Sequence, residues 1–156
     1  PNTVGYYVEA LTESFIFYPA ERFDIVGKQL LKANRKMYIV DLGLRNHILP
    51  RKNYDLGFSL ENLVYFELLR RGYKVTIGKV GNTEVDFVAE KQGAYQYFQV
   101  TPDMTAQETF EREIRPLENI RDNYEKIILT MDRLTPGNYN GIQVRYLLDW
   151  LIEIKD

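Results

Sequence analysis

The stretch from Thr83 to Thr101 constrains the fold of this chain more than any other. It consists of two arms rich in β-branched and aromatic residues, joined by the short link Lys91-Gln92-Gly93-Ala94. Two such arms around a link that contains glycine are typical of a β-hairpin. The remaining predicted elements are interpreted as packing around this hairpin.

Polar side chains occupy one face of each arm. Because side chains alternate faces along a strand, Glu84 and Asp86 share a face of the first arm. Gln99 and Thr101 share a face of the second arm in the same way. An acidic residue beside a carbonyl-bearing one, on paired strands, can hold a divalent metal through oxygen ligands. Such a site would take its oxygen ligands from Glu84 or Asp86 on the first arm and from Gln99 on the second.

Composition limits the class of protein. With 156 residues, of which 45% are hydrophobic, the chain can bury one core and is expected to form one main domain. The formal net charge of −2 gives no whole-chain argument for a nucleic-acid partner. Charge is nevertheless unevenly distributed. The charged residues within 21–52 are mainly Lys and Arg, and those within 103–125 are mainly Asp and Glu.

The sequence also indicates a compartment. The chain has no cysteine, so it has neither a disulfide framework nor thiolate chemistry. No apolar run approaches the roughly 18 residues of a membrane span, and no signal peptide is visible. We therefore expect a cytoplasmic protein with no membrane partner.

The first 40 residues predict a helix and a β-ribbon. The pattern indicates a helix over Val4–Leu11 with Thr3 as its N-cap, a strand over Phe15–Tyr18, a turn over Pro19–Asp24 and a strand over Lys36–Val40. This order suits the second half of a winged helix whose first half was removed with an upstream domain, since Pro1 is not a natural start. The alternative is a helix and ribbon that only brace the main domain.

A polar linker at residues 51–55 is the predicted boundary between residues 1–50 and a main domain over residues 55–156. The expected elements there are a helix (56–71), a strand (73–80), the hairpin, a helix (105–123) with a Thr105–Glu108 capping box, and a strand (126–131). A strand that follows a crossover helix is expected to lie parallel to its neighbour. The predicted fold class is therefore α/β, a mixed sheet flanked by helices.

Helix, three strands, helix and strand in this order resemble the restriction-endonuclease-like core of PD-(D/E)XK nucleases. Nearly the whole chain is similar to the DUF4143 domain, which follows an AAA-type ATPase module in many prokaryotic proteins. The motifs that carry this similarity are Tyr38–Leu44, Leu60–Val64, Glu84–Val88, Tyr97–Val100 and Asn123–Thr130.

The resemblance implies roles for four residues. Glu61 matches the helix glutamate of the nuclease core, and Asp86 matches its metal-binding aspartate. Gln99 stands where the core usually has glutamate, and Thr101 replaces the usual lysine. Gln99 can offer a carbonyl oxygen but no charge. Loss of a charge-stabilising donor such as that lysine typically costs about 10²–10³ in rate. The resemblance thus implies a vestigial site formed by Glu61, Asp86 and Gln99.

Other candidates for acid–base or cationic roles carry less weight. His47 is the only histidine, and without a visible partner it is interpreted as a surface residue. Lys79 and Lys91 could replace the missing lysine by strand adjacency, although nothing in the sequence brings either to the site. No Gly-x-x-x-x-Gly-Lys-[Ser/Thr] motif occurs, so ATP would bind a separate upstream module. No cofactor is expected in this chain beyond weak Mg²⁺ binding.

Three functions remain open from the sequence. The first is a degenerate nuclease-like module that binds DNA or a protein partner for the upstream ATPase module. The second is an active Mg²⁺-dependent endonuclease. The third is a protein-interaction or regulatory domain without a nucleic-acid role. The lost lysine and the basic N-terminal stretch favour the first, and the overall acidity argues against DNA binding.

Overall fold

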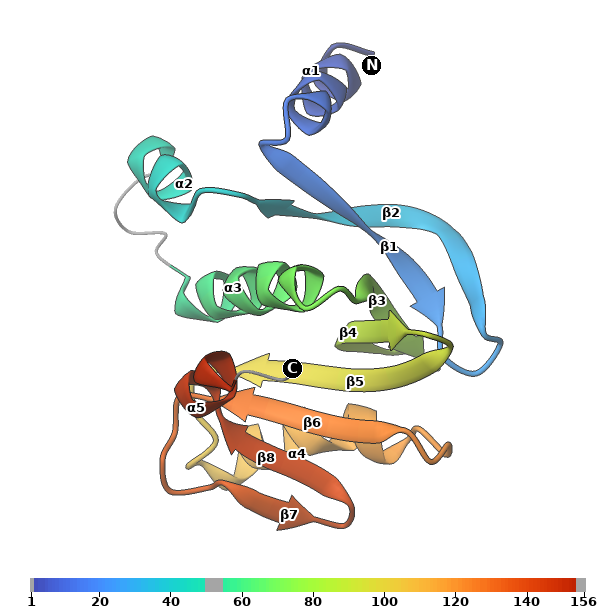
Figure 1. Cartoon of the computed structure of the whole chain (residues 1–156), viewed down its shortest axis with the longest axis vertical. Coiled ribbons are helices and arrows are strands. Elements are labelled where there is room, and N and C mark those ends of the chain that lie inside the picture. Colours follow the sequence, from blue (N-terminus) through green and yellow to red (C-terminus); the bar gives the residue numbers. More distant parts are fainter. Residues whose placement is uncertain (1, 50–54, 154–156) are drawn as a thin grey trace.

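A computed structural model describes residues 2–49 and 55–153. The fold is mixed α/β, with one mixed sheet flanked by helices (Figure 1). The helices are α1 (Asn2–Glu13), α2 (Leu42–Ile48), α3 (Leu56–Arg70), α4 (Gln107–Glu118) and α5 (Leu147–Ile152). The strands are β1 (Phe17–Asp24), β2 (Gln29–Ile39), β3 (Lys74–Val80), β4 (Thr83–Lys91), β5 (Ala94–Thr101), β6 (Glu125–Thr130), β7 (Gly137–Tyr139) and β8 (Ile142–Tyr146).

The strands follow the order β2-β1-β3-β4-β5-β6-β8-β7 across the sheet. Strands β3, β4 and β5 form an antiparallel meander, as the sequence predicts. Strand β6 follows the crossover helix α4 and lies parallel to β5, and β8 lies parallel to β6. The predicted mixed sheet is therefore confirmed.

The central hairpin is also confirmed. Strands β4 and β5 pair antiparallel and are joined by Gln92 and Gly93 alone. Both residues have positive φ, 54° and 80° respectively. Two consecutive residues of this kind make the turn whose twist matches that of paired strands. Gly93 adopts this conformation without the steric cost that a Cβ atom would add.

Two apolar clusters cover opposite faces of the sheet. On one face, Leu60, Val64 and Leu68 of α3 pack with Trp150 of α5 against inward-facing strand residues. Helix α4 covers the other face (Figure 1). The spacing of three and four residues in α3 predicts this buried stripe. The site described below lies where these two layers approach one another across the sheet.

The N-terminal ribbon belongs to the main sheet. Helix α1 is followed by an antiparallel β1–β2 ribbon, and β1 also pairs parallel with β3 through Arg22–Asp24. The turn predicted at Pro19–Asp24 is wrong, because these residues lie within β1. Pro19 is tolerated since it lies outside the part of β1 that pairs with β3. The predicted division between residues 1–50 and 55–156 stays a prediction, and residues 51–54 of the linker lie outside the described part.

Two helix starts differ from those predicted. Thr3 lies inside α1 rather than at its N-cap. Thr105 forms no capping box, because α4 begins at Gln107 and is preceded by Ala106. The Asp103 carboxylate instead accepts bonds from the Thr105 backbone N–H and hydroxyl, both at 2.9 Å. Such a local side-chain bond competes with the helix for the threonine. Helix α4 also ends at Glu118, earlier than the predicted Asn123.

Lys28, in the turn between β1 and β2, contacts the rest of the sheet. Its ammonium lies over the rings of Tyr95, Tyr97 and Tyr124, at 4.9, 5.6 and 5.6 Å from their centroids. It also donates to the Tyr97 hydroxyl and to Asp122 Oδ2, both at 2.9 Å. A cation over aromatic faces is attracted by their quadrupoles. Lys28 therefore joins the β1–β2 turn to β5 and to the segment before β6.

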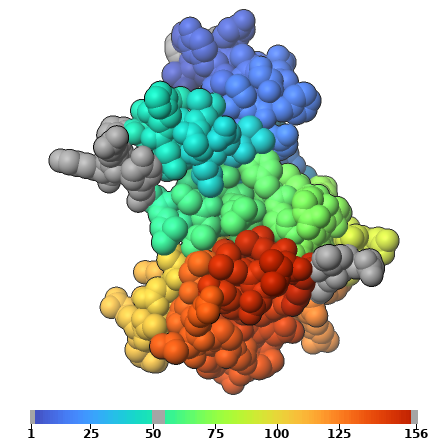
Figure 2. All heavy atoms as spheres, turned by 60° about the vertical axis from the view of Figure 1, so that its left-hand side comes forward, coloured from blue at the N-terminus to red at the C-terminus, as the bar shows by residue number. Residues whose placement is uncertain are grey.

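Helix α1 stands at one end of the molecule, far from α5 (Figure 2). Its side chains Val4, Tyr6 and Tyr7 are exposed. None of the helices in the described part of the chain has the length and hydrophobicity of a membrane span.

Candidate functional site

The site forms where strands β4 and β5 separate. Their pairing ends at Phe87 and Phe98, although β4 begins at Thr83 and β5 continues to Thr101. Beyond this point β4 stays paired with β3, and β5 stays paired with β6. The sheet therefore opens beside Asp86 and Gln99.

A β-bulge in β4 turns Asp86 toward this opening. Thr76 pairs with Val88 and Gly78 pairs with Val85, so three steps along β4 match two along β3. Val85 consequently packs under α4, whereas Phe87, two residues later, packs under α3. Bulges re-aim side chains in this way and are frequent beside functional sites.

The opening leads into a hollow of about 460 Å³. All four residues to which the resemblance assigns roles line it: Glu61, Asp86, Gln99 and Thr101. Glu84 from β4, with Arg112 and Glu113 from α4, also borders it. The sequence thus brings together residues of α3, β4 and β5, while the contribution of α4 was not predicted.

Gln99 and Asp86 bond to each other across the opening. The Gln99 carbonyl Oε1 accepts the Asp86 backbone N–H at 2.7 Å, and Asp86 Oδ2 accepts the Val100 backbone N–H at 2.8 Å. The Gln99 amide donates to Glu113 Oε2 at 3.2 Å. Side chains thus satisfy backbone donors that the separated strands no longer pair.

Glu61 is held by two residues of β2. Lys36 Nζ lies 2.6 Å from Glu61 Oε1 and 3.4 Å from Glu84 Oε1. The Tyr38 hydroxyl donates a hydrogen bond to the same Glu61 oxygen. The Tyr38 ring is fully buried and stacks on Tyr65 at 4.1 Å. Strand β2 therefore places a cation and a donor against the helix glutamate.

The ionisable side chains of the site shift one another's pKa values. Burial raises the pKa of Asp86 to about 7, and the carboxylates of Glu61 and Glu113 add to this effect. Burial alone would lower the pKa of Lys36, but Glu61 raises it above its usual value, with help from Asp86 and Glu84. Asp86 therefore carries only part of a negative charge near neutral pH, whereas Lys36 is fully charged.

Of the other sequence candidates, Thr101 lines the hollow, whereas Lys79, Lys91 and His47 lie elsewhere. The Thr101 hydroxyl donates to the Asp103 carbonyl at 3.1 Å and supplies no cation. Lys91 donates to the Arg71 carbonyl at 2.9 Å, at the other end of the hairpin. Neither Lys79 nor His47 lines the hollow, and both are exposed. The lysine that contacts carboxylates of the site is Lys36, which was not among the sequence candidates.

Lys36 and Tyr38 left a weak signal in the sequence. They are two residues apart on a predicted strand, so they share one face, and Lys36 falls in the basic stretch. Nothing in that pattern shows that β2 lies beside α3. The contact depends on pairing between segments far apart in the chain, which periodicity does not report.

The implied Mg²⁺ fits these residues poorly. The Gln99 carbonyl oxygen already accepts a backbone N–H, and Glu61 is already paired with an ammonium group. Within residues 2–49 and 55–153, no group of three or more His, Cys, Asp or Glu side chains is arranged to hold a metal ion. Mg²⁺ needs carboxylates free to replace its tightly held water.

The chain is similar to part of a longer protein. No family model matches the chain. An uncharacterized protein of Haemophilus influenzae is 41% identical over 155 residues. The match covers 97% of this chain but only 37% of the relative, so the chain corresponds to about a third of that longer protein.

Proposed function

We propose that this chain is a restriction-endonuclease-like module of the DUF4143 kind that binds DNA without cutting it, for an ATPase module of the same protein. The observation that carries the proposal is the convergence of Glu61, Asp86 and Gln99 on one hollow where β4 and β5 separate. Their internal pairing supports a binding role rather than metal-dependent hydrolysis. A longer relative is consistent with a module that works beside other segments.

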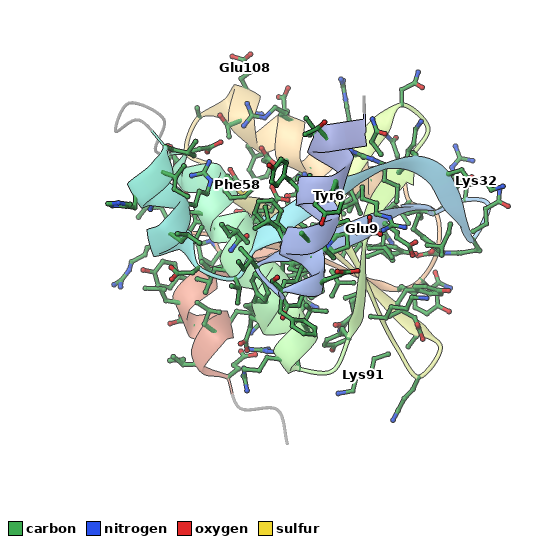
Figure 3. All side chains as sticks on the ribbon, turned by 90° about the horizontal axis from the view of Figure 1, so that it is seen from above. Tyr6, Glu9, Lys32, Phe58, Lys91 and Glu108 are labelled. Carbon is green, nitrogen blue, oxygen red and sulfur yellow. The ribbon has the colours of Figure 1, made fainter. Side chains whose placement is uncertain are left out.

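The order of α1, β1 and β2 supports reading the N-terminal segment as a winged-helix remnant. Its ribbon carries an exposed cationic bulge, residues 32–35. Arg22 pairs with Leu31 and Ala20 pairs with Lys36, so these four residues stand opposite the single residue Glu21. Lys32 projects outward from the ribbon (Figure 3). Exposed cations on the ribbon suit contacts with the phosphates of DNA.

Fluorescence anisotropy with labelled duplex DNA tests the binding. The double change Lys32→Ala and Arg35→Ala should weaken affinity roughly tenfold at low salt. It should also reduce the slope of log affinity against log salt by about 2, since each phosphate contact contributes about 0.9. The matched control is Arg115→Ala with Arg121→Ala, which removes two exposed cations of α4 and its following turn and should change neither value.

A plasmid-cleavage assay with Mg²⁺ or Mn²⁺ separates this proposal from an active nuclease. We expect no cleavage above background. The presence of Lys36 in the site is the one observation that favours activity, because it supplies a cation that Thr101 cannot. Robust cleavage that is abolished by Asp86→Ala would replace our proposal with the nuclease. Absence of DNA binding by the folded chain would instead favour a protein-interaction domain.

A further inference from the structure

We infer that Lys36 is the cation that pairs with the helix glutamate Glu61 of the site and that its ammonium group keeps divalent metal ions out. The inference rests on the proposed function only in treating the hollow as a nuclease-like site. It gives a residue of β2 the role of excluding metal ions, whereas the resemblance connects Thr101 only with the loss of the catalytic lysine.

The position of Lys36 is enclosed by negative groups. Its Nζ contacts Glu61 and Glu84, whose side chains are 13% and 41% exposed, and its own side chain is 26% exposed. Asp86 also interacts with it electrostatically. The ammonium therefore occupies the space between carboxylates to which a divalent cation would be drawn.

Strand β2 fixes this position on both sides. Before Lys36, the bulge of residues 32–35 ends and the strand returns to register opposite Ala20. Two residues later, Tyr38 anchors the strand, because its ring packs against Tyr65 and Phe87 and its hydroxyl bonds to Glu61. Lys36 and Tyr38 point to the same face, so both reach Glu61.

A metal ion would have to displace this ammonium. Like charges at close range repel, and the effect is stronger for partly buried groups than for exposed ones. Mg²⁺ and Mn²⁺ also need direct carboxylate oxygens, and Glu61 is committed to Lys36 and Tyr38. Removal of Lys36 should leave Glu61 bonded to the Tyr38 hydroxyl and Glu84 paired with Arg22, and it should open the position between the two carboxylates to a metal ion.

Titration with Mn²⁺, followed by electron paramagnetic resonance and calorimetry without DNA, tests the inference. The unmodified chain should show no saturable binding in the submillimolar range. Lys36→Ala should bind Mn²⁺ at least about tenfold more tightly, because a like charge leaves the site. Lys32→Ala removes the same charge from the exposed bulge and should behave like the unmodified chain. Adding Glu61→Gln to Lys36→Ala should remove the gain.

Circular dichroism establishes that each variant is folded, and Lys36→Gln, which keeps most of the side chain, serves if Lys36→Ala is not. Submillimolar Mn²⁺ binding by the unmodified chain would overturn the inference. So would folded Lys36→Ala or Lys36→Gln proteins that bind no better than the unmodified chain. These outcomes do not depend on DNA, so a failure of the proposed DNA binding is recognised separately.

Discussion

At the scale of single residues, Asp86 links the geometry of the site to pH. Burial, with Glu61 and Glu113, raises its pKa to about 7, well above the value near 3.9 expected in an unfolded chain. Between these values the folded state holds a proton that the unfolded state has lost. The contribution of the protonated Asp86 carboxyl to the free energy of unfolding is therefore fully present below about pH 4. It is lost as pH rises through about 7.

Asp86→Asn should remove this dependence. Asparagine does not ionise, and its Oδ1 can still accept the Val100 N–H. The free energy of unfolding of the variant, relative to the unmodified chain, should rise by more than about 1 kcal/mol between pH 4 and pH 8, since one pKa unit corresponds to about 1.4 kcal/mol. Urea denaturation at several pH values measures it. Parallel profiles for the two proteins would disprove the explanation.

Asp103→Asn is the matched control. The backbone and hydroxyl of Thr105 lower the pKa of this exposed carboxyl, which is the opposite direction from Asp86. Its contribution is present above the unfolded pKa and is lost only as pH falls through the lower folded value. Between pH 4 and pH 8 the control should therefore show little change relative to the unmodified chain.

Site residues that lie on one segment of the chain were easier to predict than site residues that come together from separate segments. Glu84 and Asp86 follow from alternation along one strand, and Glu61 came from the resemblance. Lys36, Tyr38 and Glu113 reach the same place from β2 and α4. Their roles depend on a bulge in β2 and on helix packing, which leave no periodic signal in the sequence.

At the scale of elements, Lys28 should stabilise the joint between the β1–β2 turn and the sheet. Lys28→Met keeps the apolar part of the side chain but removes the charge from the three tyrosine rings and from Asp122. We expect the free energy of unfolding to fall by about 1 kcal/mol, the size of a partly exposed cation–π contact. Hydrogen exchange should also become faster for the backbone N–H of Ile25, which bonds to the Lys79 carbonyl.

Lys32→Met is the control for this change, because Lys32 lies on the same ribbon and is exposed. It should leave both measurements unchanged, whereas Lys28→Arg should retain most of the stability. Equal effects of Lys28→Met and Lys32→Met would show that the tyrosine cluster does not hold the ribbon.

Element types were predictable where local chemistry decides them. The hairpin turn at Gln92 and Gly93 and the stripe of α3 both follow from short-range patterns. The capping box failed because Asp103, two residues earlier, satisfies Thr105 first. The turn predicted at Pro19 failed because Pro19 lies outside the part of β1 that pairs with β3, and local sequence does not indicate where that pairing begins.

At the scale of the whole molecule, the N-terminal ribbon completes the candidate site. The sequence predicted two segments joined at residues 51–55, yet β1 and β2 extend the sheet of the second segment. The parallel pairing of β1 with β3 joins residues more than fifty positions apart, so no local pattern indicates it. Because Lys36 and Tyr38 come from β2, we expect a chain that lacks the ribbon to lose the cation of the site.

A crystal structure of this chain grown in the presence of Mn²⁺, with anomalous diffraction data, tests most directly whether the site holds a lysine in place of a metal. We predict no manganese peak between Glu61, Asp86 and Gln99, with the Lys36 ammonium within hydrogen-bond distance of Glu61. A manganese ion bound to Asp86 and Gln99, with Lys36 turned away from Glu61, would contradict this account.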